Sequence, residues 1–368
     1  METTNACKEN PTVFIEKLLI QLKLEYEKYQ SDNFESIYKI INDTSECYQY
    51  CYDTACLQIN YHKNRYSNIL AHESTRALVP NVSYINANII ERYILSQGPI
   101  KHFVSDFWAM VLHYDVPIII SLAQENENGK SKFDAYFDDE DEVLVMSHEM
   151  DEMDNILINF KIRVNSKTQQ NDNTILRKVL ISDYRHLNKQ NRKLKIKNND
   201  IHFGQGIEQQ PINKEILHVQ YLGWPDHEAP KESEIITFLD IIPVIDKFDS
   251  TDPIIIHCSA GVGRSGSFCV FHKLYSIIQE ILTGNISESK LQYMLETSDQ
   301  DSINCMHSLN IRNFFSWNTF FNDRSISIDI VNTILAMRKY RYGLVQSKEQ
   351  LQFCYIALIH SIEKLLVQ

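Results

Sequence analysis

Apolar residues recur along the chain with two spacings, one typical of helices and the other of strands. Near the start, Phe14, Leu18 and Leu22 follow helical spacing, which a polar interruption at 31–33 ends. The apolar runs 117–122 and 253–257 are so continuous that we expect strands buried on both faces. The pattern predicts helices at 12–30, 34–41, 105–114, 232–248 with a kink at Pro243, 265–282, 328–341 and 347–366. It predicts strands at 84–90, 92–95, 117–122, 156–164, 174–181, 216–221 and 253–257. Strands intermixed with helices indicate an α/β fold.

Composition is that of a globular protein and excludes several other classes. The 368 residues suffice to bury a large core without disulfide or metal staples. With 43% hydrophobic and 23% charged residues, a disordered chain is excluded. The net charge of -12 argues against a nucleic-acid partner, because phosphate backbones attract basic surfaces.

Cysteine usage and apolar runs bear on the compartment. Eight cysteines are too few for a disulfide scaffold, and the cluster Cys47, Cys51 and Cys56 lacks the paired spacing of common zinc sites. We recognise no secretory signal, and the run 116–123 is too short to cross a bilayer. We therefore expect a soluble protein of a reducing compartment, without membrane insertion.

Two charge runs interrupt the pattern, an acidic one at 138–142 and a basic one at 185–197. We interpret them as solvated hairpin loops. The alternative for the basic run is a rim that attracts acidic peptides.

The most informative stretch joins a buried strand to a helix through a loop of small residues. It reads Ile254-Ile255-Ile256-His257-Cys258-Ser259-Ala260-Gly261-Val262-Gly263-Arg264-Ser265-Gly266. Small residues let backbone N–H groups turn inward, and the start of the helix adds its dipole, which makes a cradle for a dianionic oxyanion. The same field favours the thiolate of Cys258, the nucleophilic form, and Arg264 offers a planar fork for two phosphate oxygens. The alternative, an inert core cysteine, fits this context poorly.

Attack of a thiolate on a phosphoryl group also requires a proton for the departing oxygen. Asp226 lies in Gly223-Trp224-Pro225-Asp226-His227, after a strand and on a proline-braced turn. A loop of this kind presents a carboxyl group well. An isolated Trp-Pro-Asp is more often a plain turn, but beside the thiolate loop we favour Asp226 as general acid, with Trp224 in support.

From about Phe34 to the C-terminus, the chain resembles the catalytic domain of phosphotyrosine-specific protein tyrosine phosphatases. Lys63-Asn64-Arg65-Tyr66 is similar to the loop with which the family recognises phosphotyrosine, and the segment from Gln346 to Gln350 resembles its glutamine loop. Other stretches resemble structural signatures: Tyr84-Ile85-Asn86-Ala87-Asn88, Gln97-Gly98-Pro99, Asp106-Phe107-Trp108, and Arg338 with Arg341. The order of the motifs is far more specific than any one of them.

The resemblance implies a twisted mixed β-sheet flanked by helices, in a single catalytic domain at 34–368 after an N-terminal helical extension at 1–33. It implies hydrolysis of phosphotyrosine in proteins, and thus a role in signalling in the cytoplasm, with phosphotyrosine-containing proteins as partners and no metal or organic cofactor.

The resemblance also implies a role for each residue of the site. Cys258 attacks phosphorus, Asp226 first protonates the tyrosyl oxygen and then acts as base, and Gln346 places the hydrolytic water. Ser265 hydrogen-bonds the departing thiolate, and His257 holds the loop and favours the thiolate. Glu127 orients Arg264, and Lys132 lies near the general-acid loop. The substrate-binding residues are Tyr66, Asn68, Ser259, Ala260, Gly261, Val262, Gly263, Arg264, Gln346 and Gln350.

The chain departs from the family pattern at several points. Asn68 replaces an aspartate that grips the substrate backbone, so we expect weaker peptide binding. Phe133 and Phe137 replace a cysteine and a tryptophan, and the turn between 88 and 93 is short. The segment at about 283–323 has no counterpart, and we expect a surface insertion there. In its richness in Ile, Asn and Lys the chain resembles the phosphatases of insect polydnaviruses. This resemblance would place the protein in the host-cell cytoplasm.

Two other functions stay open from sequence. One is a trap that binds phosphotyrosine without turnover, although such a trap is expected to lack Cys258, Arg264 or Asp226. The other is a phosphatase acting on phosphoserine, phosphoinositide or RNA phosphates, which generally lacks the loop with Tyr66. The sequence specifies neither the physiological substrate nor the oligomeric state.

Overall fold

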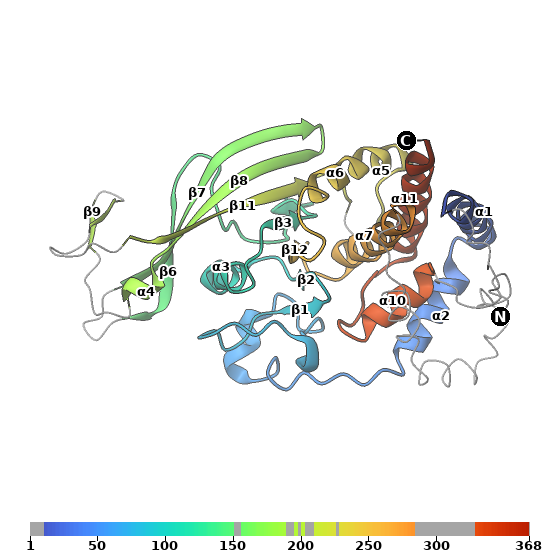
Figure 1. Ribbon diagram of the computed structural model, residues 1–368. Helices are drawn as coiled ribbons and strands as arrows, with labels where there is room; N and C mark the ends of the chain where they lie inside the picture. The colour runs from blue at the N-terminus through green and yellow to red at the C-terminus, as the bar shows by residue number, and fades with distance from the viewer. Residues whose placement is uncertain are drawn as a thin grey trace, which may run out of the picture. The chain divides into compact units, whose positions relative to one another are not determined.

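The computed structural model describes residues 11–150, 156–188, 195–197, 200–202, 210–225, 228–283 and 328–367 (Figure 1). The chain divides into two compact units. The helical unit comprises Met1–Tyr50, Pro225–Leu239 and Gly266–Gln368, and the sheet unit comprises Cys51–Trp224 and Asp240–Ser265.

The sheet unit is built on one mixed sheet of eight strands. Their order is β1 (Ala87–Ile90), β2 (Tyr93–Ser96), β12 (Ile254–His257), β3 (Ile118–Ser121), β11 (Ile212–Tyr221), β8 (Thr174–Asp183), β7 (Ile156–Asn171) and β6 (Val143–Met150). The four strands β2, β12, β3 and β11 are parallel, and the remaining pairings are antiparallel. Both β12 and β3 are buried along their whole length, as expected for central parallel strands made of isoleucine. The predicted α/β fold with a mixed sheet is confirmed.

Shorter elements surround this sheet. They are η1 (Gln58–Lys63), η2 (Glu73–Thr75), η3 (Lys101–Phe103), α3 (Val104–His113), the hairpin β4 (Asn126–Glu127) and β5 (Lys130–Ser131), α4 (Arg185–Asn188), the hairpin β9 (Lys195–Lys197) and β10 (Asp200–His202), η4 (Leu239–Ile241) and α6 (Ile242–Ile245). Helix α3 contacts β6 and β7, and its Trp108 is fully buried.

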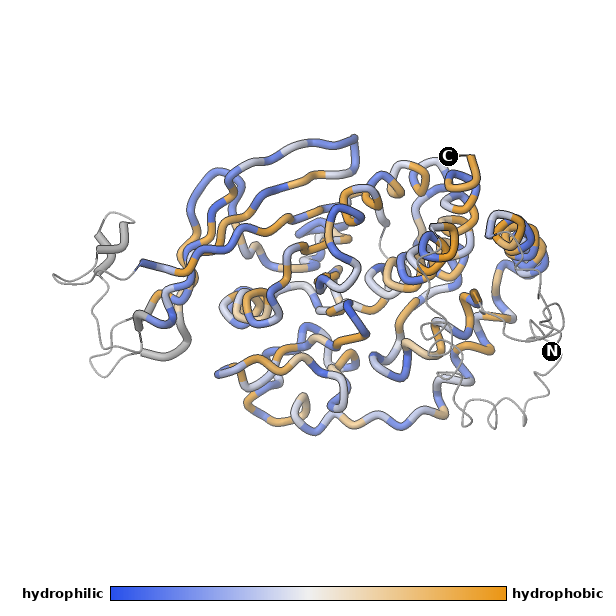
Figure 2. The backbone as a smooth tube through the Cα atoms, viewed as in Figure 1, coloured by the Kyte–Doolittle hydropathy of each residue, from blue (hydrophilic) through white to orange (hydrophobic). Residues whose placement is uncertain are grey.

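The helical unit contains α1 (Pro11–Gln30), α2 (Glu35–Ser45), α5 (Glu232–Phe238), most of α7 (Gly263–Leu282), α10 (Ile330–Arg338) and α11 (Lys348–Val367). Apolar and polar residues alternate around these helices (Figure 2), which is typical of helices that bury one face. Phe238 of α5 packs against Phe268 of α7 and Phe353 of α11, while Tyr29 of α1 packs against Tyr355 of α11. These ring contacts join α5 to α7 and α11, and α1 to α11.

Among the elements that differ from the prediction, three differ for a clear physical reason. The helix predicted at 232–248 is broken into α5, η4 and α6 and ends at Ile245, with Pro243 in the first turn of α6. Strand β7 continues to Asn171 although 165–171 is polar, because pairing with β8 supplies hydrogen bonds that need no apolar side chain. Strand β6 follows the acidic run and was not predicted, since its apolar run is short.

The prediction of solvated charge runs is wrong for Asp139. Its carboxylate accepts hydrogen bonds from Arg177, whose side chain is 6% exposed, and from Lys167. These partners hold the pKa of Asp139 at about 2 despite the desolvation that opposes them. In the basic run, Arg185 pairs with Asp183, while 189–194 lies outside the described residues.

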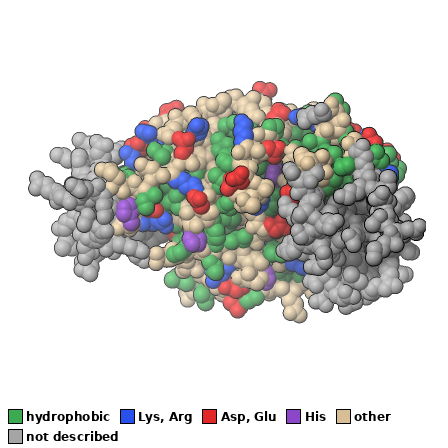
Figure 3. All heavy atoms as spheres, in the orientation of Figure 1, with side chains coloured by type: hydrophobic (Ala, Val, Ile, Leu, Met, Phe, Trp, Pro, Cys, Tyr) green, Lys and Arg blue, Asp and Glu red, His purple; other side chains and the backbone are tan. Residues whose placement is uncertain are grey.

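Charges of both signs are interspersed on the face drawn in Figure 3. Among the described residues, no helix has the length and apolar character needed to cross a membrane. The predicted insertion at 283–323 lies outside the described residues except for Thr283, and the boundary at 33 stays a prediction.

Candidate active site

The loop after β12 holds the thiol of Cys258 against a backbone N–H group. Strand β12 ends at His257, and α7 begins at Gly263. The N–H of Gly261 points at Sγ of Cys258, with a nitrogen–sulfur distance of 3.3 Å. Gly261 has φ +70°, and a Cβ there would lie 2.1 Å from the carbonyl oxygen of Ser96. Only glycine permits both the left-handed conformation and this approach to β2, so the small residue is a steric requirement of the loop.

Arg264 in the first turn of α7 is held by a carboxylate that is only slightly exposed. Its two terminal nitrogens lie 2.7 and 2.6 Å from the two oxygens of Glu127, and one of them also donates to the carbonyl of Leu122 at 3.0 Å. The side chains of Arg264 and Glu127 are 3% and 11% exposed. Glu127 is itself fixed, because it lies on the hairpin β4–β5 and accepts a bond from the N–H of Gln124. A bidentate pair of this kind fixes the plane of the guanidinium group.

Tyr66 is tied to the same loop through Ser259. The Ser259 hydroxyl donates to the carbonyl of Lys132 at 3.0 Å and lies 2.7 Å from the Tyr66 hydroxyl. Because Ser259 has a single proton, and the carbonyl takes it, Tyr66 must be the donor in the second bond. The carbonyl of Ser259 accepts from the N–H of Gly98. The ring of Tyr66 is therefore positioned relative to the Cys258 loop.

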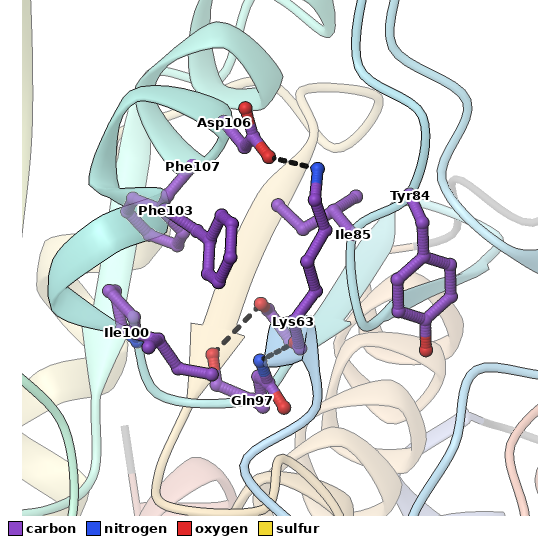
Figure 4. Close-up of a pocket in the computed structure, with 10 residues that line it drawn as sticks. Lys63, Tyr84, Ile85, Gln97, Ile100, Phe103, Asp106 and Phe107 are labelled. Atoms are coloured by element: carbon purple, nitrogen blue, oxygen red, sulfur yellow. Dashed lines mark hydrogen bonds and ion pairs between the residues drawn. The ribbon is translucent and has the colours of Figure 1, made fainter. Parts of the chain in front are cut away.

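A glutamine clamps the segment that carries Tyr66. The Gln97 amide donates to the carbonyl of Lys63 at 2.7 Å and accepts from the N–H of Arg65 at 2.9 Å. Figure 4 shows the Lys63 bond at the edge of a small pocket, where the Lys63 ammonium also reaches Asp106 at 2.7 Å. Neither Cys258 nor Arg264 lines this pocket, so we do not assign it to the substrate.

His257, the last residue of β12, contacts the first residue of the loop. Its Nδ1 lies 3.3 Å from the carbonyl oxygen of Cys258, and its Nε2 lies 2.7 Å from the hydroxyl of Tyr136. Complete burial lowers the pKa of His257 to about 4, so the ring is neutral near pH 7. Sequence reasoning did not single out Tyr136 or the histidine beyond it, His218. A polar residue at a buried position of an apolar strand was the available signal for His218.

The other predicted residues lie as follows. Ser265 is fully buried, and its hydroxyl has no hydrogen-bond partner within the described part of the chain. Val262, Lys132 and Trp224 are buried, whereas Asn68 is exposed. Asp226 lies outside the described residues. Among those residues, no group of three or more His, Cys, Asp and Glu side chains is arranged to hold a metal.

The two predicted glutamines belong to the helical unit. The side-chain oxygen of Gln350 accepts from the N–H of Gln346 at 2.8 Å and thereby ties the segment before α11 to the first turn of that helix. Just before, Val345 has φ +62°, a strained conformation for a β-branched residue. Arg338 stabilises it by donating to the carbonyls of Leu344 and Val345 at 2.8 and 2.9 Å. Backbone strain of this kind is common at functional loops.

Comparison with known proteins identifies similar chains. A family model described as protein-tyrosine phosphatase matches residues 60–297, more than half of the chain. The protein-tyrosine-phosphatase PTP1 of Arabidopsis thaliana is 28% identical over 83% of this chain and 72% of its own length. The tyrosine-protein phosphatase non-receptor type 20 of Rattus norvegicus is 27% identical over 83% of this chain and 56% of its own. Tyrosine-protein phosphatase 2 of Dictyostelium discoideum is 27% identical over 77% and 56%. The chain thus spans little more than half the length of the last two.

Proposed function

Because the chain belongs to the protein-tyrosine phosphatase family, we propose that it hydrolyses phosphotyrosine in proteins through a cysteinyl-phosphate intermediate. One observation carries the proposal beyond family membership. A buried thiol faces a backbone N–H at 3.3 Å in the loop that leads into α7, and Arg264 in that helix is oriented by Glu127. Such a loop binds an oxyanion next to a nucleophile.

The reaction has two steps. In the first, the thiolate of Cys258 attacks phosphorus, an S–P bond forms, and the bond from phosphorus to the tyrosyl oxygen breaks as Asp226 gives that oxygen a proton. In the second, a water molecule placed by Gln346 attacks phosphorus while Asp226 takes a proton from that water. The S–P bond then breaks, which releases inorganic phosphate and restores the thiolate.

The remaining residues bind or support. The buried hydroxyl of Ser265 donates a hydrogen bond to the departing thiolate. It is available for this role because it has no other hydrogen-bond partner within the described residues. The phosphate is bound by the backbone of 259–263 and by Arg264, and Tyr66 stacks on the phenyl ring. Lys132 supports the loop through its carbonyl. Asn68, exposed and neutral, accepts a weaker bond from the peptide than a carboxylate would.

We place this activity in the cytoplasm, where it would modulate tyrosine-kinase signalling. None of the six cysteines of the described residues forms a disulfide, which fits a reducing compartment. The net charge of -12 disfavours a nucleic-acid partner. We further propose that 283–323 is an insertion at the surface of a domain spanning 34–368.

The deciding experiment compares turnover of a phosphotyrosine peptide and a phosphoserine peptide by the purified protein, its Cys258→Ser variant and a matched Cys56→Ser variant. Cys56 is exposed and free, so it controls for the loss of a thiol as such. We expect hydrolysis of phosphotyrosine alone, abolished by Cys258→Ser and unchanged by Cys56→Ser. Because serine is hardly ionised at neutral pH, the nucleophile is lost while the anion cradle stays, and Cys258→Ser should still bind the peptide.

Two results would contradict the proposal. Residual turnover above about a tenth of wild type in Cys258→Ser would remove the nucleophile assignment. Tight binding of phosphotyrosine by the wild-type protein with no release of phosphate would favour the trap instead.

A further inference from the structure

A single tyrosine hydroxyl lies between two buried histidines in the sheet unit. The Tyr136 oxygen is 2.7 Å from Nε2 of His218 and 2.7 Å from Nε2 of His257. The three side chains are at most 1% exposed. His218 lies on β11 and His257 on β12, the two strands that flank β3. Trp108 anchors the tyrosine by donating to its carbonyl at 3.0 Å.

The number of protons on each group determines the direction of the hydrogen bonds that link His218, Tyr136 and His257. The Cys258 carbonyl only accepts, so Nδ1 of His257, 3.3 Å away, must carry the hydrogen. A neutral imidazole has one N–H, so Nε2 of His257 is a bare acceptor and takes the proton of the Tyr136 hydroxyl. The tyrosine oxygen must then accept from Nε2–H of His218. That leaves Nδ1 of His218 without a proton, and within the described residues this atom has no hydrogen-bond partner.

Two costs disfavour the reverse direction of these hydrogen bonds. It would place a lone pair of His257 against the lone pairs of the Cys258 carbonyl oxygen. It would also leave an N–H of His218 buried without an acceptor, which costs more than an unpaired lone pair. Both rings stay neutral near pH 7, because burial lowers the pKa of each histidine. The charged groups that act on them are Arg177 and Asp139 near His218, and Arg65 near His257.

We infer that His218 is a positioning residue: by donating to Tyr136 it selects the Nδ1–H tautomer of His257 and so holds the carbonyl of Cys258. In a trans peptide the carbonyl and the following N–H point in opposite directions. A carbonyl held by His257 therefore turns the N–H of Ser259 away from His257. The His218–Tyr136–His257 chain thus sets the first peptide of the loop that, under the proposed function, binds phosphate.

The test uses substitutions that differ in the donor they leave. His218→Phe removes the N–H donor to Tyr136. The side chain of His218→Asn is too short to place a donor where Nε2 lies. His218→Gln places an amide N–H close to that position. His113→Phe is the matched control, because His113 is an exposed histidine at the end of α3. Two readouts do not require turnover: the tautomer of His257 from nitrogen-15 NMR of the imidazole, and the affinity for tungstate, an inert tetrahedral oxyanion.

We expect His257 to be purely Nδ1–H in the wild type, His113→Phe and His218→Gln. We expect a mixture with Nε2–H in His218→Phe and His218→Asn, together with tungstate binding weaker by about fivefold, the effect of one neutral hydrogen bond. If His218→Phe does not fold, the Gln and Asn pair decides. An unchanged tautomer and unchanged tungstate affinity in the variants without the donor would overturn the inference. Failure of phosphotyrosine turnover in the wild type would instead overturn the proposed function and leave this test intact.

Discussion

Removing one charge from the largely buried pair of Arg264 and Glu127 is the most discriminating perturbation of the site. Glu127→Gln keeps the size and one acceptor oxygen but turns an N–H group toward the guanidinium. Arg264, 3% exposed, then retains its bond to the Leu122 carbonyl and one of the two bonds to position 127. Breaking a buried ion pair typically costs ~3–5 kcal/mol. Because one bond survives, we expect the free energy of unfolding to fall by about 2–3 kcal/mol.

The same change should affect catalysis, because a misplaced guanidinium binds the transferring phosphoryl group poorly. We expect kcat/KM for a phosphotyrosine peptide to fall about 10²-fold, measured where urea titration shows the variant to be folded. The matched control is Glu142→Gln, which weakens a surface pair with Lys161 in which the Glu142 side chain is 40% exposed. Pairs of that kind contribute little, so its stability should stay within about 0.5 kcal/mol of wild type. If Glu127→Gln behaved like the control in both assays, the argument that Glu127 orients Arg264 would be wrong.

Three further outcomes are expected. Gly261→Ala should lose at least about 2 kcal/mol of stability and most activity in urea titration and turnover assays, since φ is +70° and the new Cβ would meet the backbone of Ser96; wild-type behaviour would contradict the steric argument. Burial raises the pKa of Glu25 to about 7, so between about pH 4.5 and 7 the folded state keeps a proton that the unfolded state loses, and stability falls as pH rises. Glu25→Gln should therefore be more stable than wild type by up to about 3 kcal/mol at pH 8 and no different at pH 4; urea titrations that give parallel pH profiles would count against it. Replacing 285–322 by a short Gly/Ser linker should keep kcat on a small aryl phosphate within about fivefold, because loop length costs little entropy; inactivity in a variant that still unfolds cooperatively would place the segment in the active site.

The local parts of the site could be predicted from the residues alone. The apolar run before Cys258 predicts a buried strand, and small residues followed by Arg264 predict an anion-binding turn into a helix. Both predictions depend on neighbours within a few positions, where sequence spacing translates directly into geometry. The amphipathic helices and the central strands were predicted for the same reason, because their patterns also depend on the spacing of near neighbours.

Which distant groups meet depends instead on how the chain folds. The polar end of β7 has no hydrophobic pattern, and it is a strand because β8 pairs with it. Glu127 reaches Arg264 from a two-strand hairpin, and Tyr66 reaches Ser259 across the sheet unit. Nothing local to His218 predicts that its ring meets Tyr136 beside His257, because hydrogen bonds between strands far apart in sequence depend on sheet order and register. Burial then makes such contacts selective, since a buried polar group that lacks a partner is costly.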